Sequence, residues 1–163
     1  MPLFEIADET SLLAFQQLHG GSQLYESEIE KLVWDNFEEL TGEPLFPVAR
    51  QPILGGGGRP DIVALDNAAR VVVIEVKRDI DRRQLAQCLE YAGWARTTNL
   101  DELARMYHGG PDAFFAAWQE FNDAAAPTPV RRAPRLILIA RDFHGRTGSA
   151  LEFLVENHLR GPL

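Results

Sequence analysis

The sequence predicts an α/β protein in which a mixed central sheet is flanked by helices. Short runs rich in β-branched residues indicate strands, and longer stretches with apolar residues every three or four positions indicate helices. Strands separated by long helical stretches are typical of this class. With 163 residues, the chain is long enough for one domain with a substantial core.

The N-terminal part holds a weak pattern followed by a clear amphipathic helix. We expect residues 1–21 to be an N-terminal extension with a short strand around Leu3–Ile6, and residues 22–163 to form the main domain. Apolar side chains recur at helical spacing from Ser22 to Leu40. Thr41-Gly42 is predicted to end this helix, because glycine accepts the left-handed conformation beyond a last turn.

Three glutamates, at positions 26, 28 and 30, lie in the first turns of this predicted helix, where the helix dipole favours anions. On a helical wheel, Glu26 falls nearest the middle of the apolar stripe, and Glu28 and Glu30 fall on its two edges. The pattern therefore predicts that Glu26 faces inward.

The next segment is predicted to be an edge or bent strand over 45–54, because its two prolines cannot donate to a ladder. A loop of four glycines follows at 55–58. It is not a phosphate-binding P-loop, because Arg59-Pro60-Asp61 follows it in place of a lysine and a hydroxyl residue.

A β-hairpin is predicted from two strands, Asp61–Leu65 and Val71–Lys77. Side chains alternate along a strand, so Glu75 and Lys77 leave the same face of an otherwise apolar segment. If Asp66 pairs with Arg70 across a three-residue loop, Asp61 lies directly opposite Glu75 and shares that face. An even number of loop residues would turn Asp61 away.

The second half of the chain alternates predicted helices with one further buried strand. The helices are expected at 79–97, 99–107, 114–121 and 149–159, and the strand at 135–140.

Two carboxylates and a lysine on one face of a hairpin indicate a site for a divalent metal, because Mg²⁺ prefers oxygen ligands and keeps several waters. Asp61 and Glu75 would bind the metal, the Val76 carbonyl could complete its protein ligands, and Lys77 would orient or help deprotonate the attacking water. The alternative is an ion pair of Glu75 with Lys77 at a sheet edge, with Asp61 as a turn residue.

These residues resemble a known signature. Arg59-Pro60-Asp61, thirteen further residues and then Glu75-Val76-Lys77 match the pattern of the PD-(D/E)XK, or restriction-endonuclease-like, nucleases. Gln87 and Tyr91 resemble the Gln-x-x-x-Tyr element of RecB-like members, and Glu-Val-Lys-Arg before a helix is similar to the nuclease domain of NucS/EndoMS mismatch endonucleases. The expected order, helix, three strands, helix and strand (αβββαβ), is the core of that family.

The resemblance implies that Asp61, Glu75 and Lys77 are catalytic, with Glu26 as the fourth acid and Glu30 as its substitute. The same resemblance implies Mg²⁺ or Mn²⁺ as the cofactor. It also implies that Gln87 and Tyr91 contact the substrate backbone or support the site; alternatively, they form a hydrogen-bonded pair inside the domain.

Basic residues near these motifs are candidates for holding phosphates. Arg78 and Arg82 follow Lys77 closely, together with Arg83, and Arg59 and Gln51 flank the glycine loop as lesser candidates. The alternative for the arginine cluster is a solvated start of the next helix.

The bulk properties limit the partners. A net charge of −8 argues against a general positive field for nucleic acid, so any such binding must be local. The single cysteine, Cys88, excludes an internal disulfide and agrees with a cytoplasmic setting, and neither a secretion signal nor a membrane span is expected.

The predicted function is a divalent-metal-dependent DNA endonuclease. The sequence does not distinguish DNA from RNA as the substrate, and it leaves open a homodimer, or a partner or fused domain for substrate capture. The alternative is a catalytically silent module with the same fold that serves DNA binding or protein assembly.

Overall fold

The computed structural model describes residues 3–6, 25–77, 83–123, 129–140, 148–150 and 153, and for residues 3–6 and 84 the backbone alone. The elements within these ranges are, in chain order, β1 (Leu3–Ile6), α1 (Glu26–Asp35), α2 (Phe37–Thr41), β2 (Phe46–Arg50), β3 (Ile62–Leu65), β4 (Arg70–Lys77), α3 (Gln84–Thr97), α4 (Leu100–Met106), α5 (Gly110–Asn122) and β5 (Arg131–Ala140).

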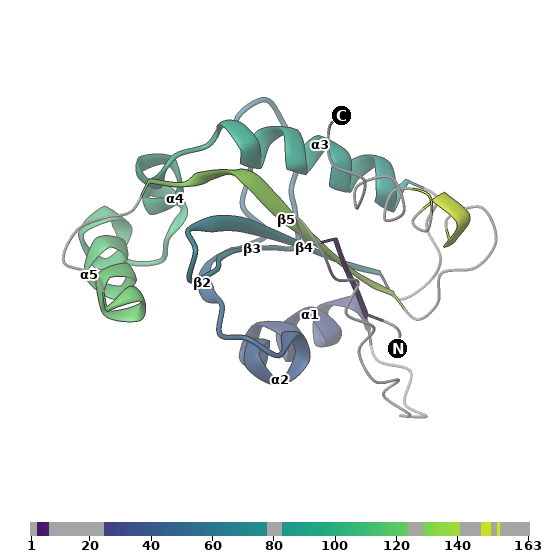
Figure 1. The fold of residues 1–163 in the computed structure, drawn as a ribbon, viewed down its shortest axis with the longest axis horizontal. Coiled ribbons are helices and arrows are strands. Elements are labelled where there is room, and N and C mark those ends of the chain that lie inside the picture. Colours follow the sequence, from purple (N-terminus) through teal and green to yellow (C-terminus); the bar gives the residue numbers. More distant parts are fainter. Residues whose placement is uncertain are drawn as a thin grey trace.

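The described strands form one mixed sheet in the order β1-β5-β4-β3-β2. β4 and β5 run parallel, and the other neighbouring strands run antiparallel. Helices cover both faces, with α3 on one side and α1 and α2 on the other (Figure 1). This arrangement confirms the predicted α/β class with a mixed sheet. The short strand predicted at Leu3–Ile6 is confirmed as β1, at the edge of the sheet beside β5.

The side chains of β4 divide the core into two layers. Val71 and Val73 pack on the face covered by α3, α4 and α5, whereas Val72, Ile74 and Val76 pack on the face covered by α1 and α2. This alternation is the one predicted from the sequence. A strand buried on both faces leaves little solvent for any charged side chain that it carries.

The helix predicted over 22–40 is two helices, α1 and α2, which meet at Asn36. This residue has φ −141° and ψ 47°, and its side-chain amide donates to the carbonyl of Leu32 at 2.8 Å. A side chain that competes for backbone hydrogen bonds favours a helix end over a helix interior. The predicted end at Thr41-Gly42 is confirmed, with Gly42 in the left-handed region at φ 76°.

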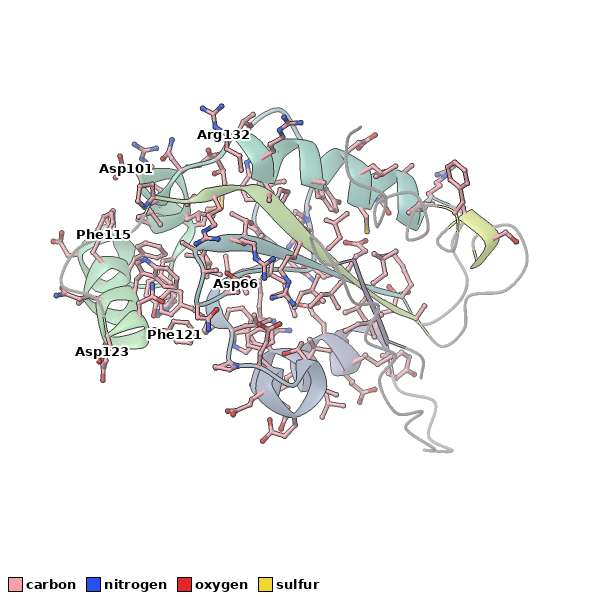
Figure 2. The ribbon with its side chains drawn as sticks, viewed as in Figure 1. Asp66, Asp101, Phe115, Phe121, Asp123 and Arg132 are labelled. Atoms are coloured by element: carbon pink, nitrogen blue, oxygen red, sulfur yellow. The ribbon has the colours of Figure 1, made fainter. Side chains whose placement is uncertain are left out.

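An aromatic cluster covers the edge strand β2. The ring of Phe46 lies 5.2 to 5.6 Å, centroid to centroid, from the rings of Phe114, Trp118 and Phe121 on α5. Figure 2 labels Phe121 on α5, at the end of the molecule away from β1. α5 begins at Gly110, earlier than the predicted position 114, because proline is tolerated in a first helical turn.

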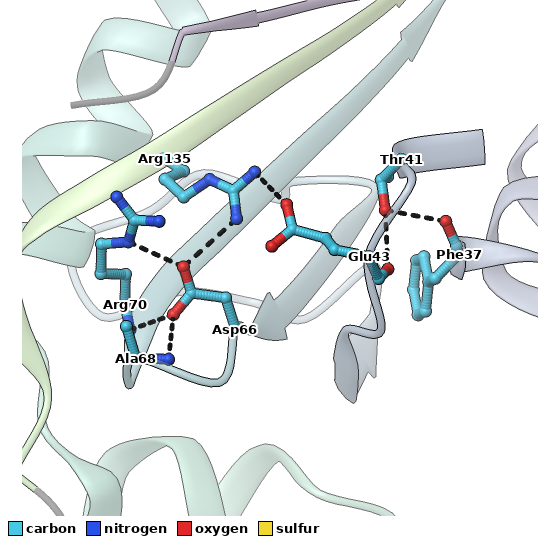
Figure 3. A network of polar contacts seen from close by, with 7 residues as sticks. All are labelled: Phe37, Thr41, Glu43, Asp66, Ala68, Arg70 and Arg135. Carbon is cyan, nitrogen blue, oxygen red and sulfur yellow. Dashed lines mark hydrogen bonds and ion pairs between the residues drawn. The ribbon is translucent and has the colours of Figure 1, made fainter. Parts of the chain in front are cut away.

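A buried charge network closes the β3–β4 hairpin at the same end of the sheet (Figure 3). The fully buried carboxylate of Asp66 accepts hydrogen bonds from the N–H groups of Ala68 and Arg70, both at 2.9 Å, and from Nε of Arg70 at 2.7 Å. Arg135 of β5 donates to Asp66 at 3.2 Å and also binds Glu43. Burial lowers the pKa of the Arg135 guanidinium to about 10, so it stays charged at neutral pH. The network ties the hairpin to β5 and to the segment after α2.

β5 begins at Arg131, four residues before the predicted start at 135, because Arg131 pairs with Arg70 at the beginning of β4. Most of the helix predicted over 149–159 lies outside the described residues, as do residues 7–21 of the predicted extension. No helix in the described ranges combines the length and the apolar composition that a membrane span requires.

Candidate active site

The β3–β4 hairpin sets the geometry of the candidate site. The N–H of Asp66 donates to the carbonyl of Arg70 at 3.1 Å, so the loop has three residues, as predicted. The antiparallel register continues without a shift to the first residue of β3. One step further along, Asp61 lies opposite Glu75, and the odd-numbered loop puts both on one face of the sheet.

The predicted trio meets at the end of β4. Nζ of Lys77 lies 3.0 Å from Oε1 of Glu75 and 4.0 Å from Oδ2 of Asp61. The side chain of Glu75 is 3% exposed, and those of Asp61 and Lys77 are each 18% exposed. This is not an exposed ion pair at a sheet edge, which is the alternative considered for these residues, because β4 is an inner strand between β3 and β5.

Burial dominates the electrostatics of the two carboxyl groups of the trio. Burial raises the pKa of Asp61, against the opposing hydrogen bond from Val76 and the charge of Lys77. Burial and then repulsion from Asp61 raise the pKa of Glu75. For Lys77, burial alone would lower the pKa, but the hydrogen bond and the charge of Glu75 outweigh it and raise the pKa. Lys77 is therefore charged at neutral pH. For Asp61 and Glu75, burial makes the charged form less favourable than it is in water.

The Val76 backbone joins the same group. Its N–H donates to Oδ2 of Asp61 at 2.7 Å, on the edge of β4 where β3 has ended. In a strand, the N–H and C=O of one residue point to the same neighbour. The Val76 carbonyl therefore faces the side on which the Asp61 carboxylate lies, which is the position expected of a third metal ligand.

The prediction that Glu26 faces inward is wrong. Glu26 is exposed, whereas Glu30 is buried, with 3% of its surface accessible. The helical wheel counted Tyr25 and Leu32 as part of the buried stripe, but both are largely exposed at 68% and 41%, so the buried face is rotated toward Glu30. Both glutamates act on Asp61 by charge repulsion, Glu30 more strongly than Glu26.

Glu30 accepts hydrogen bonds from two side chains at the end of β2. Nε of Arg50 donates to one of its carboxylate oxygens at 2.9 Å, and Nε2 of Gln51 donates to the other at 2.8 Å. Gln51 was a lesser candidate in the sequence, and Arg50 was missed. The available signal was its place in the sequence, because Arg50 is a basic residue that follows the apolar run from Phe46 to Ala49 and precedes Gln51.

The Gln…Tyr pair lies on α3, above the face that carries Glu75. Tyr91 is 4% exposed, and its hydroxyl accepts a hydrogen bond from the backbone N–H of Arg59 at 3.4 Å. Burial and then the charge of Glu75 raise the pKa of Tyr91. Oε1 of Gln87 is buried and has no hydrogen-bond partner within the described residues. Gln87 and Tyr91 are therefore not joined through this oxygen in the described part of the chain.

The predicted phosphate contacts are described only in part. Arg78 and Arg82 lie outside the described residues. Arg59 is exposed, and its Nε donates to the carbonyl of Gln51 at 3.1 Å, beside the glycine loop. Arg83 is exposed at the start of α3.

Buried Cys88 lies near the trio but is inert, because burial and the charge of Glu75 raise the pKa of its thiol to about 12.

The residues present fit a divalent cation that keeps some of its water. The described residues contain no cluster of three or more His, Cys, Asp or Glu side chains suited to a metal. Asp61, Glu75 and the Val76 carbonyl offer three hard oxygen donors, a set that suits Mg²⁺ or Mn²⁺ with water and phosphate as further ligands. Burial is the first cause of the raised pKa of both carboxyl groups, and a bound cation would stabilise both in their charged form.

A groove of about 830 Å³ lies far from this chemistry. Its lining comes from the end of α3, the start of α4, one ring of α5 and the start of β5. Figure 2 shows three of its residues, Asp101, Phe115 and Arg132, at the end of the molecule that carries α4 and α5. The candidate site lies at the opposite ends of β4 and β5, and none of its residues line the groove.

Comparisons with models of protein families, with curated proteins and with solved structures gave no match to this chain. The geometry of the described residues is therefore what supports a function.

Proposed function

We propose that this protein is a metal-dependent DNA endonuclease with a restriction-endonuclease-like core. The observation that carries the proposal is the meeting of Asp61, Glu75 and Lys77 on one face of the hairpin, with the Glu75 side chain 3% exposed. If β1, α2, α4 and α5 are taken as additions, the remaining order α1, β2, β3, β4, α3, β5 agrees with the αβββαβ core of these nucleases and supports the proposal. Burying two carboxylates side by side destabilises a fold, so their presence favours a functional reason.

The chemistry divides among the side chains of the site. Asp61 and Glu75, with the Val76 carbonyl, would hold Mg²⁺ or Mn²⁺, which supplies an activated water and positive charge for phosphodiester hydrolysis. Lys77, charged and fixed by Glu75 at 3.0 Å, would orient that water and balance the charge that develops on the phosphate. Of the two helix acids, Glu30 is buried and acts on the charge of Asp61, whereas exposed Glu26 acts on the charges of both Asp61 and Lys77.

Substrate contacts would come from the α3 face and the glycine loop. The exposed guanidinium of Arg59, whose backbone N–H donates to the Tyr91 hydroxyl, and the side-chain amide nitrogen of Gln87 would donate hydrogen bonds to phosphates of a nucleic-acid backbone. The net charge of −8 means that few phosphates are neutralised, so we expect weak binding by this chain alone. A homodimer or a partner domain that captures the substrate is part of the proposal.

The test is cleavage of linear and circular duplex DNA, and of RNA of the same sequence, with Mg²⁺, Mn²⁺ or EDTA. We expect metal-dependent cleavage of DNA, with rates reduced about a thousandfold or more in Asp61→Asn and in Lys77→Ala. Arg96→Ala, in the distant groove, is the matched control and should cut like the wild type. If the wild type binds DNA but leaves every substrate intact with every metal, the chain is a silent binding module.

A further inference from the structure

Gln51 joins three parts of the candidate site. Its backbone N–H donates to the carbonyl of Asp61 at 2.8 Å, and its own carbonyl accepts from Nε of Arg59 at 3.1 Å. Its side-chain amide donates to the buried carboxylate of Glu30 at 2.8 Å. Gln51 thus bonds to Glu30 on α1, to Asp61 directly before β3 and to Arg59, directly after the glycine loop.

The backbone of Gln51 is held in an unfavourable conformation. Its φ of 47° lies in the left-handed region, which a residue with a long side chain rarely adopts. Such strain persists only where the surroundings over-determine the conformation, and it gathers at functional sites. Here the three hydrogen bonds provide that constraint. The strained position also marks the point at which the chain leaves β2 and enters the glycine loop.

Glu30 is a fixed anchor for this contact. It lies in the middle of α1, is 3% exposed, and has its second carboxylate oxygen bound by Arg50 at 2.9 Å. The two donors to this carboxylate, Arg50 and Gln51, are the last residue of β2 and the residue that follows it. Glu30 therefore fixes the end of β2 in place. The position of Gln51 is therefore set by a helix that packs on the sheet.

We propose that Gln51 is a positioning residue, which transfers the fixed position of Glu30 to the backbone of Asp61 and so sets the Asp61 carboxylate for the metal. This inference rests on the proposed function. The Asp61 carboxylate is already bound at one oxygen by the Val76 N–H, so a small shift of the Asp61 backbone changes the direction of its remaining lone pairs. Supporting partners of metal ligands typically change metal affinity or activity by about 10-fold to 100-fold when they are removed.

Gln51→Asn is the sharpest test. Asparagine accepts the left-handed backbone and keeps the amide, but it is one methylene too short to reach Glu30. We expect the midpoint of thermal unfolding to change little, the dissociation constant for Mn²⁺ from calorimetric titration to rise about tenfold, and the Mg²⁺ concentration for half-maximal cleavage to rise in parallel, with KM for DNA unchanged. A merely structural role would instead lower the unfolding midpoint.

A reversed pair provides the rescue. Glu30→Gln should weaken Mn²⁺ binding as Gln51→Asn does, and the double variant Glu30→Gln/Gln51→Glu, which restores an amide–carboxylate hydrogen bond, should recover most of the loss. Glu38→Gln, an exposed glutamate on α2, is the control and should bind Mn²⁺ like the wild type.

The outcomes separate this inference from the proposed function. Cleavage by the wild type together with wild-type Mn²⁺ affinity in Gln51→Asn overturns the positioning role and leaves the nuclease standing. No cleavage by the wild type, but Mn²⁺ binding that Asp61→Asn abolishes and Gln51→Asn weakens, overturns the nuclease and supports the positioning role. A wild type that binds no Mn²⁺ overturns both.

Discussion

Replacing Asp66 by asparagine tests the buried charge network of Figure 3 at the end of the sheet away from the candidate site. Asparagine has the same shape but carries no charge, and its amide presents two donors where the carboxylate had only acceptors. In the folded protein, Asp66 is fully buried and accepts from Nε of Arg70 at 2.7 Å and from Arg135 at 3.2 Å. The variant therefore removes a carboxylate partner from two guanidinium groups, of which Arg135 is 2% exposed.

The expected loss follows from these two contacts. A hydrogen bond to a charged group contributes about 1.5–3 kcal/mol, and removing one partner of a buried ion pair costs roughly 3–5 kcal/mol. We expect the free energy of unfolding to fall by about 3–4 kcal/mol. For a domain of this size, each kcal/mol corresponds to roughly 2–4 °C, so the unfolding midpoint should fall by about 10 °C.

Urea denaturation followed by circular dichroism measures this change, with Lys31→Ala as the control. Lys31 forms an exposed ion pair with Asp35 on α1, and removing such a pair costs about 0.5 kcal/mol or less. A fall of less than about 1 kcal/mol in Asp66→Asn, similar to that of Lys31→Ala, would show that the network contributes no more than a surface pair and would refute the reasoning.

Two further predictions concern the candidate site. In the metal-free protein, burial raises the pKa of both Asp61 and Glu75, so the folded state binds protons that the unfolded chain releases. The contribution of these two groups to the free energy of unfolding should be full below their ordinary pKa values, near pH 4. It should be lost as the pH rises through the raised values. Urea unfolding from pH 4 to 8 should show this loss in the wild type and a smaller loss in Asp61→Asn. An equal change of the free energy of unfolding with pH in both proteins would contradict the prediction. Gly58→Ala should lower the free energy of unfolding by about 1–2 kcal/mol, because Gly58 has φ 97° and a Cβ there would lie 3.0 Å from the ring of Tyr91. Gly55→Ala, which meets nothing within 4 Å, is its control, and an equal effect in both variants would exclude the contact with Tyr91 as the cause.

The sequence by itself determined the hairpin and what it brings together. The alternation of apolar residues along β4, with Glu75 on the same face as Lys77, needed only the period of a strand. The three-residue loop then fixed the register, because Asp66 and Arg70 close it locally. Local rules of this kind place Asp61 opposite Glu75 with no knowledge of the rest of the fold.

Only the tertiary structure decided which helix acid turns inward. The wheel assumed that every apolar residue of α1 is buried, but a helix buries only the stripe that meets its neighbour, and Leu32 stays exposed. The partners of Glu30 lie 20 and 21 residues away at the end of β2, beyond any local pattern. The same holds for the contact of Gln51 with the backbone of Asp61, because the left-handed conformation of Gln51 is imposed by its hydrogen bonds with Glu30, Arg59 and Asp61 rather than by its own preference.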